Sequence, residues 1–194
     1  MTMYDFIDQK KVVMVTFAVI LAISALIAPA ALFYPIKAMF ITPLATHIGT
    51  NFISLITGGV GLLLIAAALI VLVVIDSKAK RYSLAAVLVV VGVLGTALSL
   101  SDYYYMTSEK FVYNGPWEFT EHTYTWDDFD RIEEHVAMEG GTRKTQAIAL
   151  FTKDGNEIKM STGTIFLMAG SLTGYIEQAG GTSERVVVDD EASE

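Results

Sequence analysis

Three long stretches without any charged residue decide what this chain can fold into. They span residues 12–33, 52–75 and 84–101. A helix needs about 20 apolar residues to cross the roughly 30 Å of hydrocarbon in a bilayer. We therefore predict three transmembrane helices in a multi-pass membrane protein.

The first stretch raises the alternative of a cleaved signal peptide, because Lys10 and Lys11 precede it. Its apolar run is longer than the about 7–15 residues of such a signal, and a second span follows soon after. An anchoring helix is therefore favoured. Pro29 is expected to bend or end its last turn, which membrane helices tolerate.

The connections between the spans differ in character. Residues 34–51 contain Pro35 and Pro43 and are too short for a fourth crossing, so we predict an interfacial or re-entrant loop. Aromatic residues suit the two membrane interfaces, and this region offers Tyr34, Phe40 and Phe52. Residues 76–83 read as a charged turn between the second and third spans.

The basic residues predict the orientation, since cytoplasmic loops are enriched in lysine and arginine. One side holds Lys10, Lys11, Lys78, Lys80 and Arg81, whereas the first loop on the other side holds only Lys37. We expect a cytoplasmic N-terminus in the cell membrane. Three spans then place the C-terminal domain outside the cytoplasm.

The spans themselves carry no charge of the kind that marks transport paths. Their glycines favour close packing of a three-helix bundle, or of a homo-oligomer formed through the helices. These residues are Gly58, Gly59, Gly61, Gly92 and Gly95. A substrate path built from the backbone of residues 57–61 is the alternative.

A break in charge near Ser101 marks a domain boundary. Residues 1–101 carry 3 acids and 6 bases, a net of +3, and residues 102–194 carry 18 acids and 7 bases, a net of −11. Nucleic acids and anionic lipids both bind basic surfaces, so we expect neither as a ligand of the acidic residues 102–194. Arg143, Lys144, Lys153 and Lys159 form at most a modest basic face. The chain has no cysteine, which excludes disulfides and cysteine-type zinc sites.

Residues 102–180 predict a β-rich domain, with short runs of aromatic and β-branched residues cut by turn signals. Residues 103–114 form one strand or two, and residues 117–126 alternate like a strand. Asp154-Gly155 predicts a hairpin turn between two alternating runs. Apolar residues from Ile165 to Ile176 recur at helical spacing, so one closing helix is expected, ended by Gly180 and Gly181. Residues 181–194 read as an acidic tail, mobile apart from the segment 185–188.

The acidic stretch at residues 123–135 suggests either a carboxylate site or a solvated junction between strands. Asp127, Asp128 and Asp130 would face different directions, and no glycine or later glutamate completes a calcium loop. His122 and His135 lie thirteen residues apart without a third ligand. We favour the junction, with Trp126, Phe129 and Ile132 in the core. No catalytic, cofactor-binding or metal-binding residue is predicted.

The order of several antiparallel strands, a hairpin at Asp154-Gly155 and one closing helix resembles bacterial pleckstrin-homology-like domains. The motif of Trp126, Asp127, Asp128, Phe129 and Ile132 carries most of the similarity, with 150–160 as its later counterpart. It covers residues 103 to 180. The chain resembles in particular small membrane proteins of low-GC Gram-positive bacteria with such a domain. This resemblance implies an antiparallel sandwich or barrel. It also implies a cytoplasmic domain, against the charge bias.

Together these features predict a non-enzymatic integral membrane protein that holds a protein-interaction domain at the bacterial envelope. Two alternatives remain at this level. One is a small transporter or channel subunit, and the other is an envelope-stress or antimicrobial-peptide immunity factor. No cofactor is expected, and the expected partners are the bilayer and another protein.

Overall fold

A computed structural model of the chain describes residues 3–41, 47–139, 142–160 and 168–188. It forms two compact units. The first comprises Met1–Lys37 with Ile53–Ser101, and the second comprises Ala38–Phe52 with Asp102–Glu194. The chain therefore enters the second unit twice.

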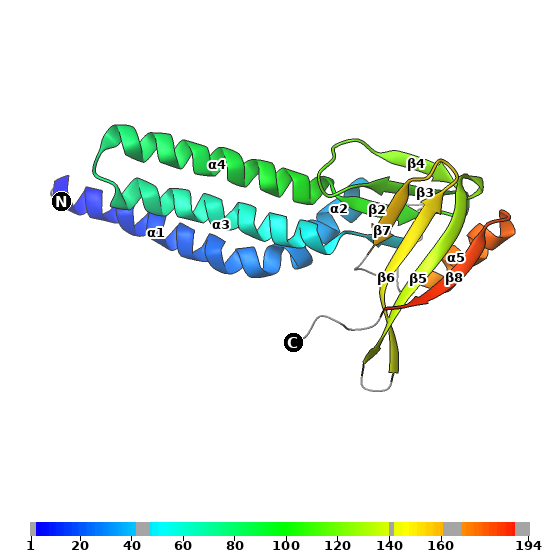
Figure 1. Cartoon of the computed structure of the whole chain (residues 1–194). Coiled ribbons are helices and arrows are strands. Elements are labelled where there is room, and N and C mark those ends of the chain that lie inside the picture. Colours follow the sequence, from blue (N-terminus) through cyan, green and yellow to red (C-terminus); the bar gives the residue numbers. More distant parts are fainter. Residues whose placement is uncertain (1–2, 42–46, 140–141, 161–167, 189–194) are drawn as a thin grey trace. The chain divides into compact units, whose positions relative to one another are not determined.

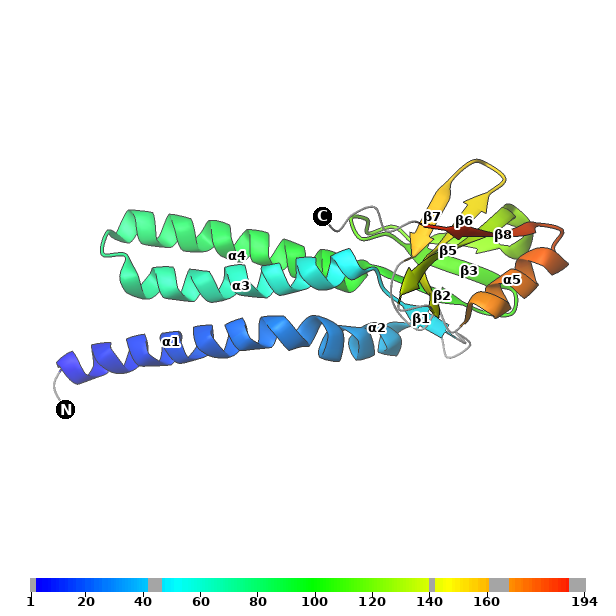
Figure 2. The same ribbon diagram turned by 60° about the horizontal axis from the view of Figure 1, so that its bottom comes forward.

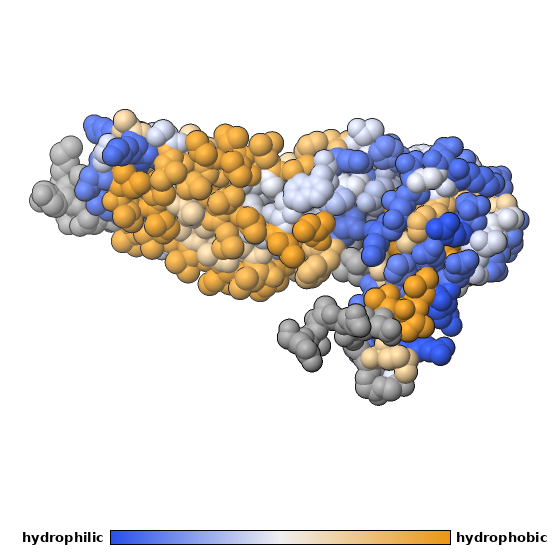
Figure 3. Space-filling view, in the orientation of Figure 1, coloured by the Kyte–Doolittle hydropathy of each residue, from blue (hydrophilic) through white to orange (hydrophobic). Residues whose placement is uncertain are grey.

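The first unit consists of long apolar helices (Figure 1). Its elements are α1 (Met3–Ala28), η1 (Pro29–Phe33), the start of α2 (Tyr34–Phe40), α3 (Phe52–Val74) and α4 (Lys78–Ser101). Three helical segments, Gln9–Phe40, Phe52–Val74 and Lys78–Ser101, are long and apolar enough to cross a membrane. Apolar side chains cover most of the visible surface of these helices, and hydrophilic side chains lie at the end near the N-terminus (Figure 3). The prediction of three candidate spans is confirmed.

The first helical segment is longer than the sequence predicts. α1 ends at Ala28, as expected from Pro29, but five residues of π-helix and then α2 carry the helical path on to Phe40. Proline lacks a backbone N–H, and the wider π turn accommodates the missing hydrogen bond. The prediction that a loop begins at residue 34 is therefore wrong.

Glycines let the helices of this unit approach closely. A Cβ atom added at Gly61 would lie 2.7 Å from the carbonyl oxygen of Gly92, and one added at Gly92 would lie 2.7 Å from that of Gly61. One added at Gly59 would lie 2.9 Å from the carbonyl oxygen of Ala25. Only glycine fits such distances, so the prediction that these glycines serve close packing is confirmed.

Among the described residues, the second unit has two four-stranded sheets and the helix α5 (Figure 2). The first sheet has the order β1-β2-β3-β4, and the second has the order β7-β6-β5-β8. Their elements are β1 (His47–Gly49), β2 (Tyr103–Met106), β3 (Lys110–Asn114), β4 (His122–Thr125), η2 (Trp126–Asp128), β5 (Phe129–Glu139), β6 (Thr142–Thr152), β7 (Glu157–Met160), α5 (Ala169–Gln178) and β8 (Thr182–Val187).

One hydrophobic core joins the two sheets and α5. β-strand alternation sends every second side chain of the strands inward, and α5 adds Leu172 and Ile176, both with no exposed surface. The cluster consists of Tyr104, Met106, Phe111, Trp126, Phe129, Ile132, Ile148, Leu150, Ile158, Met160, Leu172 and Ile176. Trp126, Phe129 and Ile132 lie in this core, as predicted.

The segment before α3 contributes a strand to the domain. β1 pairs antiparallel with β2, with Ile48 opposite Tyr105. The interfacial loop predicted for 34–51 is thus wrong at this end also, and the predicted domain start at residue 102 misses the segment. Three residues of strand are too few for a periodic signal, so only the pairing reveals them.

The C-terminal part departs most from the prediction. β8 follows α5 and pairs in parallel with β5, so residues 182–187 are a strand rather than part of a tail. The helix therefore does not close the domain, and the second sheet is mixed rather than purely antiparallel. Of the predicted sandwich or barrel, the described residues form two sheets that are not closed into a barrel, so a pleckstrin-like barrel is not confirmed. Gly180, with a φ of +89°, turns the chain from α5 into this strand.

Two local predictions are also refined. The turn after β6 has Gly155 at a φ of +84°, and no described non-glycine residue has a positive φ. It is therefore a three-residue loop with a glycine bulge, not a two-residue turn with both Asp154 and Gly155 left-handed. The strand predicted for 117–126 is restricted to β4, whereas Trp117 and Phe119 lie in the preceding loop, 62% and 65% exposed. The predicted helix start near Ile165 and the break at Gly163 lie outside the described residues.

Candidate functional site

The acidic stretch forms a solvated junction, as predicted. Asp127, Asp128 and Asp130 are exposed, while Trp126 between the strands is buried. The Asp128 carboxylate accepts hydrogen bonds from the backbone N–H and the hydroxyl of Thr125, at 2.7 and 2.8 Å. These bonds lower the pKa of Asp128. The aspartates therefore shape the turn between β4 and β5.

The two histidines stay apart, each beside one glutamate. His122 Nε2 lies 3.1 Å from a Glu118 carboxylate oxygen, and His135 Nε2 lies 3.3 Å from Glu133. Within the described ranges no three histidine, aspartate or glutamate side chains gather as a metal site would require. The four basic residues are spread along the hairpin: Arg143 and Lys144 lie near the start of β6, Lys153 follows its end, and Lys159 on β7 is opposite Ala149.

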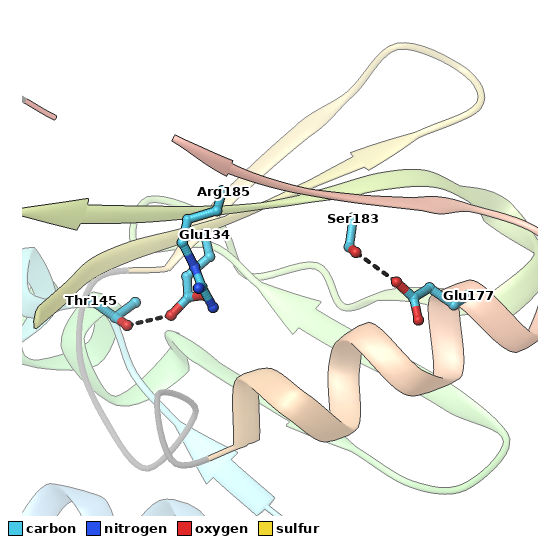
Figure 4. A network of polar contacts seen from close by, with 5 residues as sticks. All are labelled: Glu134, Thr145, Glu177, Ser183 and Arg185. Atoms are coloured by element: carbon cyan, nitrogen blue, oxygen red, sulfur yellow. Dashed lines mark hydrogen bonds and ion pairs between the residues drawn. The ribbon is translucent and has the colours of Figure 1, made fainter. Parts of the chain in front are cut away.

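The structure places a polar groove where β5, β8 and α5 meet. Its volume is about 210 Å³, and Ile132, Glu134, Thr173, Ser183, Glu184 and Arg185 line it. Figure 4 shows the polar contacts around it. Glu134 follows Ile132 on the inward face of β5, so its carboxylate extends the core face of the sheet beyond the apolar cluster.

The Glu134 carboxylate has strong partners. The hydroxyl of Thr145 donates to one oxygen at 2.5 Å, and Arg185 donates to the other through Nε and an η nitrogen at 2.9 and 2.7 Å (Figure 4). The hydrogen bond from Thr145, followed by that from Arg185, lowers the pKa of Glu134. Arg185 nevertheless keeps 59% of its side-chain surface exposed. Glu134 is thus neutralised, and the guanidinium is held in place on β8.

A hydroxyl–carboxylate contact ties β8 to the helix. Ser183 on β8 donates a hydrogen bond to Glu177 on α5 at 2.6 Å (Figure 4). Ser183, Arg185 and Val187 alternate along β8 on the side that faces α5, where Val187 is 55% exposed. β8 therefore presents a polar stretch and then an apolar end.

The outer face of β5 carries a second polar row. Arg131 Nε donates to Glu133 at 2.8 Å, and its guanidinium lies 3.9 Å from the centre of the Phe151 ring. The Arg131 hydrogen bond lowers the pKa of Glu133, with a smaller contribution from His135. This row covers the small side chains of Ala147 and Ala149 on β6, both buried. The polar row therefore shields this face of β6 from water.

Sequence reasoning missed both the groove and the buried carboxylate of Asp102. Asp102 has no exposed surface and is bound by residues 50 and 51. The sequence offers only a weak indication of the role of Asp102, which is a single acid directly after the predicted span 84–101. For the groove the signal was Arg185 before three valines, which indicates a strand rather than a tail.

The fold and the groove define a class: a protein with three helices able to span a membrane and a mixed-sheet domain with an open strand edge. No family model, no curated protein and no solved structure matches the chain.

Proposed function

We propose that the chain is a non-enzymatic integral membrane protein whose β-rich domain binds a basic, extended segment of a partner protein along β8. The single observation that carries the proposal is that β8 is an exposed edge strand. It stands last in the order β7-β6-β5-β8, and its residues Thr182 to Arg185 are all exposed. An unpaired strand edge is a template on which another extended chain can add.

Backbone geometry identifies the groups available on this edge. The N–H of Val188 donates to the carbonyl of Val136 on β5, at 2.8 Å. Because successive peptide groups of a strand point to opposite sides, the N–H groups of Val187 and Arg185 point away from β5. These are the donors that an added strand would use.

Exposed apolar residues at the end of the β8 edge also support binding of a partner there. Met138 on β5 is 55% exposed, and Val187 and Val188 are 55% and 39% exposed. Val187 pairs with Val136, two residues from Met138, so all three residues lie at the same end of the sheet. Exposed apolar residues grouped in this way are typical of interaction sites.

Charge supports a basic partner. Residues 102–194 carry a net charge of −11, and the sequence after β8 continues into Asp189, Asp190 and Glu191. Complementary charge accelerates association and rejects acidic competitors. A domain of this net charge, with an acidic sequence after β8, fits lysine- and arginine-rich chains. The predicted similarity to pleckstrin-like domains of bacterial membrane proteins stays a prediction and adds no ligand.

Photo-crosslinking in native membranes tests the proposal. A photoreactive amino acid replaces Glu184 on β8, and a matched control replaces the exposed Lys153 in the hairpin turn. We expect a distinct covalent adduct from position 184 only. Val187→Pro removes an outward N–H and should abolish that adduct, whereas Val187→Thr keeps the N–H and should retain it. Adducts of equal yield from both positions, or an adduct insensitive to Val187→Pro, would contradict strand addition.

The same negative charge favours a second candidate function, immunity to cationic antimicrobial peptides. Such peptides share the basic chemistry of the proposed partner. This function predicts that deletion sensitises cells to cationic peptides but not to acidic ones. A scaffold without this role leaves both sensitivities unchanged.

A further inference from the structure

The loop between β3 and β4 carries two strongly exposed aromatic side chains, Trp117 and Phe119. Trp117 is 62% exposed and Phe119 is 65% exposed. Exposed tryptophan and phenylalanine in neighbouring positions are costly in water, so such a pair marks a contact with another apolar phase. Neither side chain belongs to the groove or to the β8 edge.

The register of the first sheet places this loop at one end. Tyr103, the first residue of β2, is opposite Asn114, the last residue of β3, and Tyr113 is opposite His122 at the start of β4. Residues 115–121 therefore leave and re-enter the sheet at the end where β2 begins. β2 begins two residues after Ser101, where the third candidate span ends.

The chemistry at this end is that of a membrane interface. Tryptophan and tyrosine are enriched at the level of the lipid headgroups, where the ring is in apolar surroundings and the polar tip is hydrated. Tyr103 stacks on Tyr105 with ring centres 6.2 Å apart and donates its hydroxyl to Glu121 at 2.7 Å. Burial, together with this hydrogen bond, raises the pKa of Tyr103, so the hydroxyl remains protonated.

Polar groups in and beside this loop form hydrogen bonds with one another. The N–H of Glu118 donates to the Gly115 carbonyl at 3.2 Å, which closes a turn, and its carboxylate lies 3.1 Å from His122. The residues of this loop include acids and no lysine or arginine. Electrostatic attraction to anionic lipid would therefore not hold this loop at a membrane.

We propose that Trp117 and Phe119 insert into the headgroup region of the bilayer that the chain's own helices cross. The loop then acts as a hydrophobic anchor that holds this end of the first sheet at the membrane surface. The partner is the lipid interface itself, reached through apolar and aromatic contacts. Because the contact is tethered by a span that ends two residues before β2, a weak insertion is sufficient.

The chain provides its own probe, because it contains only two tryptophans. Trp126 is 7% exposed in the core, with its indole N–H donated to the Ser108 carbonyl at 3.1 Å. The full chain is reconstituted in zwitterionic phosphatidylcholine whose acyl chains carry bromine, a contact quencher of tryptophan, either near the headgroups or near the bilayer centre. The emission of the wild type minus that of Trp117→Phe isolates Trp117 without disturbing the core.

We expect bromine near the headgroups to reduce the Trp117 emission clearly, because interfacial tryptophans lie at the level of the headgroups. Bromine near the bilayer centre should reduce it less, and added salt should leave both values unchanged. Phe119→Ser should weaken the quenching of Trp117. Free access of aqueous iodide to Trp117 without quenching by bromine would overturn the proposal. Protection from both quenchers would also overturn it, because it would show a protein contact instead.

Discussion

Asp102 and Asn51 stand 51 positions apart in the sequence, yet two hydrogen bonds of 2.8 Å join them. The backbone N–H of Asn51 donates to one carboxylate oxygen of Asp102, and its side-chain amide donates to the other. Thr50 adds its hydroxyl at 2.7 Å. A carboxylate with no exposed surface thus fixes the segment before α3 to the residue after α4.

Replacing this carboxylate should destabilise the domain. Asp102→Ala leaves the donors of Thr50 and Asn51 without their acceptor in a buried place, which costs about 3 kcal/mol. Thermal unfolding in detergent should show a lower midpoint for this variant. The control Asp127→Ala removes an exposed aspartate and should change stability by less than about 0.5 kcal/mol. Equal midpoints for both variants would mean that the hydrogen bonds of Asp102 contribute nothing to stability.

The lowered pKa of Glu134 predicts a pH dependence. The folded pKa lies below the unfolded value of about 4.3, so the ionised carboxylate contributes stability above that value. The contribution is lost as the pH falls through the folded pKa. Melting temperatures of the full chain from about pH 7 down to about pH 3 should therefore decrease.

Thr145 provides the control for this pH effect, because its hydrogen bond is the largest cause of the shift. Thr145→Val removes the donor while the shape of the side chain is nearly kept. The variant should be less stable at neutral pH and should lose less stability on acidification than the wild type. An identical acid dependence would assign the effect to other carboxylates such as Glu133.

Gly174 within α5 and Gly181 after it should respond to alanine in opposite ways. A Cβ atom at Gly181 would lie 2.6 Å from a methyl carbon of Ile176 and 2.9 Å from the carbonyl oxygen of Asp130. Gly181→Ala should therefore cost about 1–3 kcal/mol, because backbone must move. Gly174 within the helix has nothing within 4 Å of the added atom, so Gly174→Ala should stabilise by about 0.5–1 kcal/mol. Chemical unfolding of both variants compares these effects, and the same sign for both would refute the packing at Gly181.

Long apolar spans and alternating strands could be predicted from the sequence, whereas short strands that pair with distant segments could not. The span at 52–75 corresponds to α3, because an uncharged run of that length is long enough to form a membrane-crossing helix. The span at 84–101 lies within α4, but α4 already begins at Lys78, so the predicted turn at 76–83 is wrong from residue 78 on. The burial of Phe129 and Ile132 also followed from alternation. These predictions rest on local properties of many consecutive residues.

The missed features depend on partners distant in the sequence. β1 is recognised only through its pairing with β2, and β8 only through its parallel pairing with β5. Trp117 and Phe119 alternate with polar residues as a strand would, but Pro116 and the turn at Gly115 take them out of the sheet. The groove at Glu134 could not be predicted, because Arg185 reaches it from 51 residues away.

Topology decides where the β8 edge and the Trp117 loop meet their partners. The basic residues around the spans predict that Ser77, between α3 and α4, faces the cytoplasm and that the domain lies on the other side. The chain contains no cysteine, so single cysteines can be installed at Ser77 and at Ser171, both exposed. A thiol reagent that does not cross membranes is applied to intact cells, and then to permeabilised cells as the labelling control. We expect labelling of Ser171→Cys in intact cells and labelling of Ser77→Cys only after permeabilisation. The opposite pattern would place the domain in the cytoplasm and would make the partner of β8 a cytoplasmic protein.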